Sequence, residues 1–161
     1  MQRECYRFGG VTFAIEAAAP IERSQICAPF RVTDGAPEHT ICLHFDDRPP
    51  VPPETAQHRG AVWRWQSGAE RHLLEQYGTP DKPPRFTYAV TRGAHTEVTF
   101  ANAYRAGASV RAVLEAAGIF DIFAARGMLV LHSAYIVTSA GEAILFSGPS
   151  GVGKSTQAAL W

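Results

Sequence analysis

The chain has 161 residues, of which 46% are hydrophobic, and its equal numbers of basic and acidic side chains give a formal net charge of zero. This length suits one globular domain and part of a second, and the neutral charge argues against a protein that binds nucleic acid or an anionic membrane. No apolar run approaches the roughly 18 residues of a membrane span, and the first ten residues lack the apolar core of a signal peptide. We therefore expect a soluble, cytoplasmic protein.

Residues 1–108 are expected to form a β-rich domain. Apolar residues alternate on both sides of Gly9-Gly10, which predicts a hairpin, and residues 39–45 alternate in the same way. Four prolines within residues 46–55 predict a loop, because proline cannot donate a hydrogen bond inside a sheet.

The second half of this β-rich domain has a comparable pattern. Two strands are expected around Ser67-Gly68, although residues 69–77 also fit a helical turn or two. A second proline-rich loop is expected at 79–85, and a further hairpin around 92–94. Trp63 and Trp65 form a stripe that can stack bases but is more typical of one face of a half-buried strand.

The pattern changes to helical spacing at residues 109–127, which predict one or two connecting helices. Ser109 is the expected N-cap, Gly127 the expected C-terminal stop, and Gly118 a possible division between two helices. Residues 128–138 and 143–147 then predict two strands. The four-residue turn between these strands implies an antiparallel hairpin.

The second strand leads into the segment GPSGVGKS, which fits the phosphate-loop motif G-x-x-x-x-G-K-[ST] at every fixed position. Glycines let such a loop turn its backbone amides toward phosphate oxygens, and the following helix adds its positive end. Lys154 is expected to reach the β- and γ-phosphates, and the Ser155 hydroxyl to bind Mg²⁺. The predicted nucleotide-binding residues are Gly148, Ser150, Gly151, Val152, Gly153, Lys154, Ser155 and Thr156. A glycine-rich turn that binds nothing is the alternative.

Residues 128–161 resemble the HPr kinase/phosphatase-related proteins, whose nucleotide site is of the phosphoenolpyruvate-carboxykinase type. The resemblance depends on Leu131-His132-Ser133-Ala134, the turn at Gly141 and the run from Phe146 to Trp161. It is strongest to a branch often found beside peptide-modification genes, and upstream only the order of elements is similar. The resemblance implies an ATP- and Mg²⁺-dependent kinase that phosphorylates a hydroxyl on a protein or peptide. The nucleotide, ATP or GTP, stays open.

The same resemblance marks His132, because a histidine on this strand lies near the phosphates in that family. A single histidine on an apolar strand is otherwise more typical of a hydrogen-bonded core residue. The remaining histidines and the three cysteines, Cys5, Cys27 and Cys42, show no metal-binding spacing. We expect reduced thiols, some of them buried, and histidines of the surface or sheet. The pair Asp46-Asp47 fits a solvated loop better than a metal or acid pair.

Phosphoryl transfer also needs carboxylates to hold Mg²⁺ and to accept a proton, and in this family they follow the helix after the loop. The sequence printed above ends six residues after Ser155. Three interpretations stay open: a fragment of a longer kinase, which we favour, half of a split enzyme, or a complete nucleotide-binding module without chemistry. A second chain or a second copy is expected to cover Leu160 and Trp161. The predicted fold is α+β, with an incomplete kinase-type phosphate-loop domain over 128–161.

Overall fold

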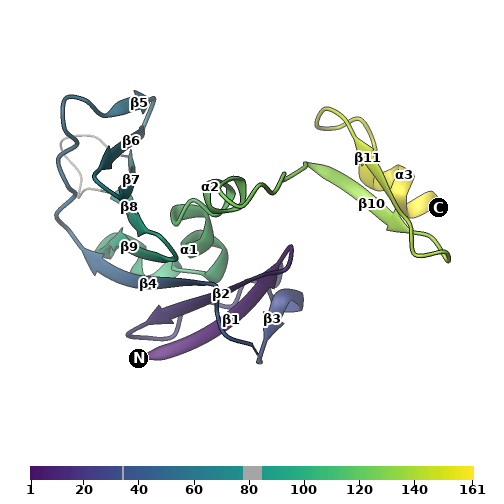
Figure 1. Ribbon diagram of the computed structural model, residues 1–161, viewed down its shortest axis with the longest axis horizontal. Coiled ribbons are helices and arrows are strands. Elements are labelled where there is room, and N and C mark those ends of the chain that lie inside the picture. Colours follow the sequence, from purple (N-terminus) through teal and green to yellow (C-terminus); the bar gives the residue numbers. More distant parts are fainter. Residues whose placement is uncertain (34, 78–84) are drawn as a thin grey trace. The chain divides into compact units, whose positions relative to one another are not determined.

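A computed structural model describes residues 1–33, 35–77 and 85–161 (Figure 1). The chain divides into two compact units, Met1–Ile119 and Phe120–Trp161. Among the described residues, a nine-stranded mixed sheet dominates the first unit, and the helices are few and short. This arrangement confirms the α+β prediction and the β-rich character of the first hundred residues.

Eleven strands and five helical segments make up the described parts of the chain. The strands are β1 Gln2–Phe8, β2 Val11–Ala17, β3 Arg31–Val32, β4 His39–Asp46, β5 Gln57–Arg59, β6 Val62–Ser67, β7 Glu70–Tyr77, β8 Arg85–Arg92, β9 His95–Ala101, β10 Ser133–Val137 and β11 Ala143–Ser147. The helical segments are η1 Ala28–Phe30, η2 Asn102–Gly107, α1 Val110–Ala116, α2 Ile119–Ala124 and α3 Lys154–Leu160.

The large sheet has the order β3-β1-β2-β4-β9-β8-β7-β6-β5. Its centre is parallel, since β4 pairs in parallel with both β2 and β9, while the outer pairs are antiparallel. The parallel pairing joins segments that are far apart in sequence. It aligns Cys42 of β4 with Glu16 of β2 on one side and with Glu97 of β9 on the other.

The predicted hairpins of this sheet are confirmed. Gly9 and Gly10 connect β1 to β2 with positive φ angles of 55° and 86°, which glycine adopts without steric cost. Of residues 69–77, all but the first lie in strand β7 (Glu70–Tyr77), so the helical alternative is wrong. The reason is pairing on both sides, because β7 is hydrogen-bonded to β6 and to β8. The loop predicted at 46–55 contains no strand or helix apart from Asp46, which ends β4. Most of the loop predicted at 79–85 lies outside the described residues.

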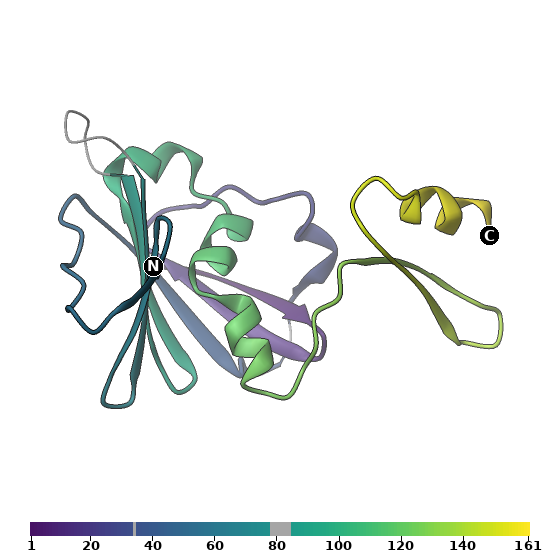
Figure 2. The same cartoon turned by 90° about the horizontal axis from the view of Figure 1, so that it is seen from above.

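The main core lies on one face of the sheet. Phe13, Ile41 and Val98 are fully buried there, and each alternates with a residue that points to the opposite face. Helix α1 lies beside β8 and buries Val110 and Val113 completely (Figure 2). The alternation predicted around Gly9-Gly10 and at residues 39–45 and the helical spacing predicted from residue 109 account for Phe13, Ile41, Val110 and Val113.

A second apolar cluster lies on the opposite face, toward the β6 end of the sheet. Leu74, Phe86 and Ala101 are its buried members, and Trp63 and Trp65 pack against it. The tryptophan stripe is therefore one face of a half-buried strand, as its spacing indicated. The ring of Trp65 also stacks on a histidine of β7, at position 72, with 4.7 Å between ring centroids.

The predicted helix signals of residues 109–127 are confirmed. Ser109 caps α1, and its Oγ accepts a hydrogen bond from the amide of Ala112 at 3.3 Å. Gly118, with a φ of 69°, separates α1 from α2. After α2, the amide of Gly127 bonds to the carbonyl of Ala124 and the amide of Met128 to the carbonyl of Phe123. This pair of bonds around a glycine with a φ of 71° is a Schellman motif.

The second unit holds most of α2 together with β10, β11 and α3. The antiparallel hairpin is confirmed, but the strand predicted from Met128 begins only at Ser133. Residues 128–132 pair with no described strand, because β11 ends at Ser147 and the chain then enters the glycine loop. Of residues 124–161, all described, none is buried. No described helix is long and apolar enough to cross a membrane.

Candidate phosphate-binding loop

The hairpin places the predicted phosphate loop between a strand and a helix. β11 ends at Ser147, residues 148–153 form the loop, and α3 begins at Lys154. Ser147 pairs with Ser133 at the end of the hairpin, so the residue before β10 and the residue after β11 lie at the same end. The motif therefore has the strand–loop–helix context that phosphate loops require.

Two loop glycines have conformations that side-chain-bearing residues rarely adopt. Gly151 has a φ of 81° and Gly153 a φ of 91°, both in the left-handed region. A Cβ atom at either position would meet no other atom within 4 Å, so the requirement for glycine comes from the backbone and not from crowding. At Gly148, by contrast, a Cβ would lie 3.1 Å from Cγ1 of Val152. These glycines shape a loop that turns sharply into α3.

Lys154 folds back over the start of the loop. Its Nζ donates hydrogen bonds to the carbonyl oxygens of Gly148 and Pro149, both at 2.9 Å. The ammonium group is therefore held at the loop and bonded to neutral acceptors. A phosphate oxygen is a stronger acceptor for an ammonium because both partners are charged. The donor set of the loop thus fits a nucleotide phosphate.

The first turn of α3 adds backbone donors to this set. The amide of Gln157 bonds to the carbonyl of Gly153, and this is the first i to i−4 bond of the helix. The amides of Lys154, Ser155 and Thr156 precede it and have no acceptor within the helix. Such amides, together with the loop amides, are suited to phosphate oxygens.

The remaining predicted residues are accessible. Ser150, Val152, Ser155 and Thr156 are exposed. Ser155 follows Lys154 directly, and its hydroxyl is the group that would hold Mg²⁺ beside a bound phosphate. Placing these side chains along the loop was possible from the sequence, since the motif is continuous.

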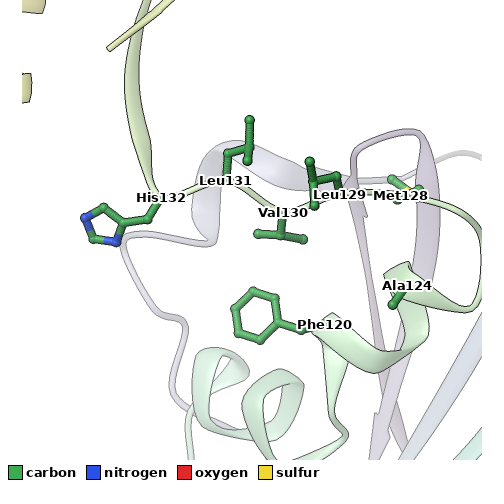
Figure 3. Close-up of a pocket in the computed structure, with 7 residues that line it drawn as sticks. All are labelled: Phe120, Ala124, Met128, Leu129, Val130, Leu131 and His132. Atoms are coloured by element: carbon green, nitrogen blue, oxygen red, sulfur yellow. The ribbon is translucent and has the colours of Figure 1, made fainter. Parts of the chain in front are cut away.

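His132 lies outside the strand on which it was predicted. It directly precedes β10 and is exposed, so the alternative of a hydrogen-bonded core histidine is wrong. The register of the hairpin places it at the same end as Gly148. In Figure 3 its ring points away from Phe120 and Val130. The structure thus brings His132 to the loop end of the hairpin.

An open apolar pocket of about 510 Å³ lies beside His132. Its lining residues are Phe120, Ala124, Met128, Leu129, Val130, Leu131 and His132 (Figure 3). Few polar groups line this pocket, and its lining residues all precede β10 in the sequence. The pocket therefore does not extend the donor set of the loop.

Residues 120–161 contain two acidic side chains, Asp121 and Glu142. Glu142 belongs to the turn that joins β10 to β11, at the opposite end of the hairpin, and Asp121 lies in α2. Neither acidic residue belongs to the loop or to α3, and Glu142 lies at the end of the hairpin away from the loop. The pair Asp46-Asp47 lies in the first unit and stabilises its own loop, with Asp47 accepting hydrogen bonds from Asn102.

The structure also brings together residues that sequence spacing did not select. Cys42, His95 and Glu97 offer ligand atoms within 4.8 Å of one another. The available signal was alternation, because Cys42 and His44 share one face of a strand and His95 and Glu97 share one face of another. The pairing of those two strands was not predictable. All three cysteines are free thiols, and Cys27 is buried.

Comparisons with known proteins gave no similarity on which to build. No protein-family model, no curated protein and no solved structure matches the chain.

Proposed function

We propose that this chain is the ATP- and Mg²⁺-binding part of a serine kinase similar to the HPr kinase/phosphatase-related proteins. The observation that carries the proposal is the complete phosphate-loop motif between β11 and α3, with Gly151 and Gly153 left-handed and Lys154 folded over the loop. In this proposal Lys154 and the loop amides bind the β- and γ-phosphates, and Ser155 holds the Mg²⁺ that neutralises them.

The kinase activity itself needs groups beyond this loop. The resemblance at Leu131-His132-Ser133-Ala134 and along Phe146–Trp161 supports a kinase of the phosphoenolpyruvate-carboxykinase type. His132, at the loop end of the hairpin, would act there as a charge or hydrogen-bond donor to the γ-phosphate. Glu142 lies at the far end of the hairpin, so the carboxylates for Mg²⁺ and proton transfer would come from another polypeptide segment.

The exposed apolar side chains of this unit support a further polypeptide packed on it. Leu160 is 74% exposed and Trp161 is 79% exposed. Others on the hairpin are exposed as well: Tyr135, Val137, Ile144 and Leu145. A completing kinase segment, a second chain of a split enzyme or a second copy would bury them. The position of Glu142 at the far end of the hairpin also favours one alternative function, a nucleotide-binding module that performs no chemistry.

The proposal is tested by calorimetric titration of the full chain with ATP in the presence of Mg²⁺. Lys154→Ala is expected to weaken binding about 10- to 100-fold, because a charge-assisted hydrogen bond contributes about 1.5–3 kcal/mol. Gln157→Ala is the matched control, since Gln157 is exposed on the same helix outside the motif. Parallel titration with GTP decides the nucleotide.

The outcomes separate the interpretations. Binding that requires Lys154 without turnover of ATP supports the binding part of a kinase or the non-catalytic module. Turnover that Lys154→Ala abolishes would show that this chain supplies its own catalytic carboxylate. Equal titrations of the unmodified chain and Lys154→Ala would contradict nucleotide binding by the loop.

A further inference from the structure

A row of polar side chains crosses the centre of the large sheet, on the face opposite the main core. Glu16 of β2, Cys42 of β4 and Glu97 of β9 are direct neighbours in the two parallel pairings. The residues that alternate with them, such as Ile15 and Ile41, are buried in the main core. Glu16, Cys42 and Glu97 therefore point to the opposite face of the sheet. The sheet therefore holds one carboxylate on each side of the Cys42 thiol.

Two histidines flank this row. His44 lies two residues beyond Cys42 on β4, and His95 lies two residues before Glu97 on β9, so both share the face of the row. His95 Nε2 lies 2.5 Å from Glu97 Oε1. His44 Nε2 makes a hydrogen bond with the other carboxylate oxygen, Oε2. Glu97 is thus held between the two imidazoles.

The thiol completes a compact donor set. The ligand atoms of Cys42, His95 and Glu97 all lie within 4.8 Å of one another. Tetrahedral Zn²⁺ binds N, O and S ligands at about 2.0–2.3 Å, which separates its ligand atoms by about 3.3–3.6 Å. Small side-chain rotations would bring the three donors to this spacing, and the ion would replace the hydrogen bond between His95 and Glu97.

We propose that Cys42, His95 and Glu97 bind a Zn²⁺ ion on the face of the large sheet opposite the main core. A thiolate, an imidazole and a carboxylate are the ligand types that Zn²⁺ takes in proteins, whereas Mg²⁺ prefers oxygen ligands alone. The fourth position is open to water. This site is in the first unit and is separate from the proposed nucleotide site.

Two neighbouring residues support the ligands. His44 holds the second oxygen of Glu97, the arrangement by which hydrogen-bonded partners orient a ligating carboxylate. The Cys42 thiol donates to Glu16 Oε2 at 3.7 Å, and Glu16 adds negative charge beside the site. When the ion binds, the thiol proton is released to solvent and the thiolate becomes the ligand.

The test is titration of the full chain, freed of metal and reduced, with Co²⁺ and then with Zn²⁺. We expect one equivalent of Co²⁺ to produce a thiolate-to-cobalt absorption band, and Zn²⁺ to remove it by displacement. Cys42→Ser should abolish the band. His95→Ala and Glu97→Gln should each weaken Zn²⁺ binding at least about 100-fold, since removal of outer partners alone costs about 10- to 100-fold.

Matched variants control for folding and for other donors. Cys5→Ser removes a partly buried thiol of β1 outside the cluster, and His58→Ala removes an exposed histidine of β5. Both should bind like the unmodified chain. His44→Ala should weaken binding about 10- to 100-fold while keeping the cobalt band, as expected for a positioning residue.

A measurement on the unmodified chain does not depend on the variants folding. Zn²⁺ should protect Cys42 from alkylation and leave Cys5 reactive, as read by mass spectrometry of the peptides. Absence of the cobalt band, a band that survives in Cys42→Ser, or alkylation of Cys42 unchanged by Zn²⁺ would overturn the proposal.

Discussion

Gly153 connects the proposed phosphate loop to α3 with a φ of 91°. Because this conformation costs a residue with a Cβ about 1–2 kcal/mol, we expect Gly153→Ala to distort the loop and weaken Mg²⁺-ATP binding by about 5- to 30-fold. Calorimetric titration measures the effect. Gly107→Ala is the control, since Gly107 has no positive φ and a Cβ there meets no atom within 4 Å. Unchanged affinity in Gly153→Ala would show that the loop does not hold the nucleotide.

Glu4 is a second residue whose environment has a measurable consequence, here the pH dependence of the stability of the fold. Burial alone would raise its pKa, but hydrogen bonds from Tyr6 and Arg23, and the charges of Arg23 and Arg31, together lower the pKa below 4.5. The Tyr6 hydroxyl donates to Glu4 Oε2 at 2.6 Å, and Arg23 Nη2 lies 2.8 Å from Oε1. The ionised carboxylate therefore stabilises the folded state.

The sign of the pH dependence follows from this lowered pKa. The stabilisation is present above the unfolded-state pKa of Glu4 and is lost as pH falls through the lower, folded-state pKa. We expect Glu4→Gln to be less stable than the unmodified chain at pH 6, with the difference shrinking below about pH 4. Urea unfolding at each pH measures it. A difference that stays constant between pH 6 and pH 3 would contradict the prediction.

At the scale of elements, the face of each strand decides what its residues do. On β7, Leu74 is fully buried against Phe86 and Ala101, while its neighbour Leu73 is only half-buried on the other face. We expect Leu74→Ala to cost about 2–5 kcal/mol of unfolding free energy, because it removes packed atoms and leaves a cavity. Leu73→Ala should cost less. Urea unfolding compares the two, and equal losses would contradict the assigned faces.

The hairpin of β10 and β11 shows the limit of local patterns. Residues 128–138 have the apolar character of one long strand, yet only Ser133–Val137 pairs. A residue joins a strand only where a neighbouring strand pairs with it, and β11 is followed at once by the glycine loop. The same pairing moves His132 out of the strand and to the loop end of the hairpin.

At the scale of the whole molecule, the buried side chains are unevenly distributed. Every buried residue of the described chain lies at or before Phe123, and α2 is closed by the Schellman motif at Gly127. We expect residues 1–127 alone to unfold cooperatively in urea, since this segment retains all of those residues. Ile41→Ala in the same segment should lower its stability by about 2–5 kcal/mol. A gradual, non-cooperative transition would contradict this prediction.

Residues 128–161 have a different balance, with exposed apolar side chains and no buried residue. A two-stranded hairpin with a seven-residue helix is marginally stable by itself. We therefore expect the full chain to self-associate at lower concentrations than residues 1–127, as light scattering would show.

The sequence alone determined the features that depend on neighbouring residues. The β1–β2 turn at Gly9-Gly10, the Ser109 cap, the division at Gly118 and the residues of the phosphate-loop motif were all predictable. Each depends on a backbone conformation or a hydrogen bond within a few positions, and side-chain chemistry specifies such contacts directly.

Only the tertiary structure decided which distant segments meet. Cys42 and Glu97 become neighbours because β4 pairs in parallel with β9, although β5–β8 lie between these two strands in the sequence. A period-2 pattern reports the face of each residue but not the partner strand or its register. The proposed phosphate loop could therefore be recognised from one continuous motif. The proposed zinc site, assembled from two strands, emerged only from the fold.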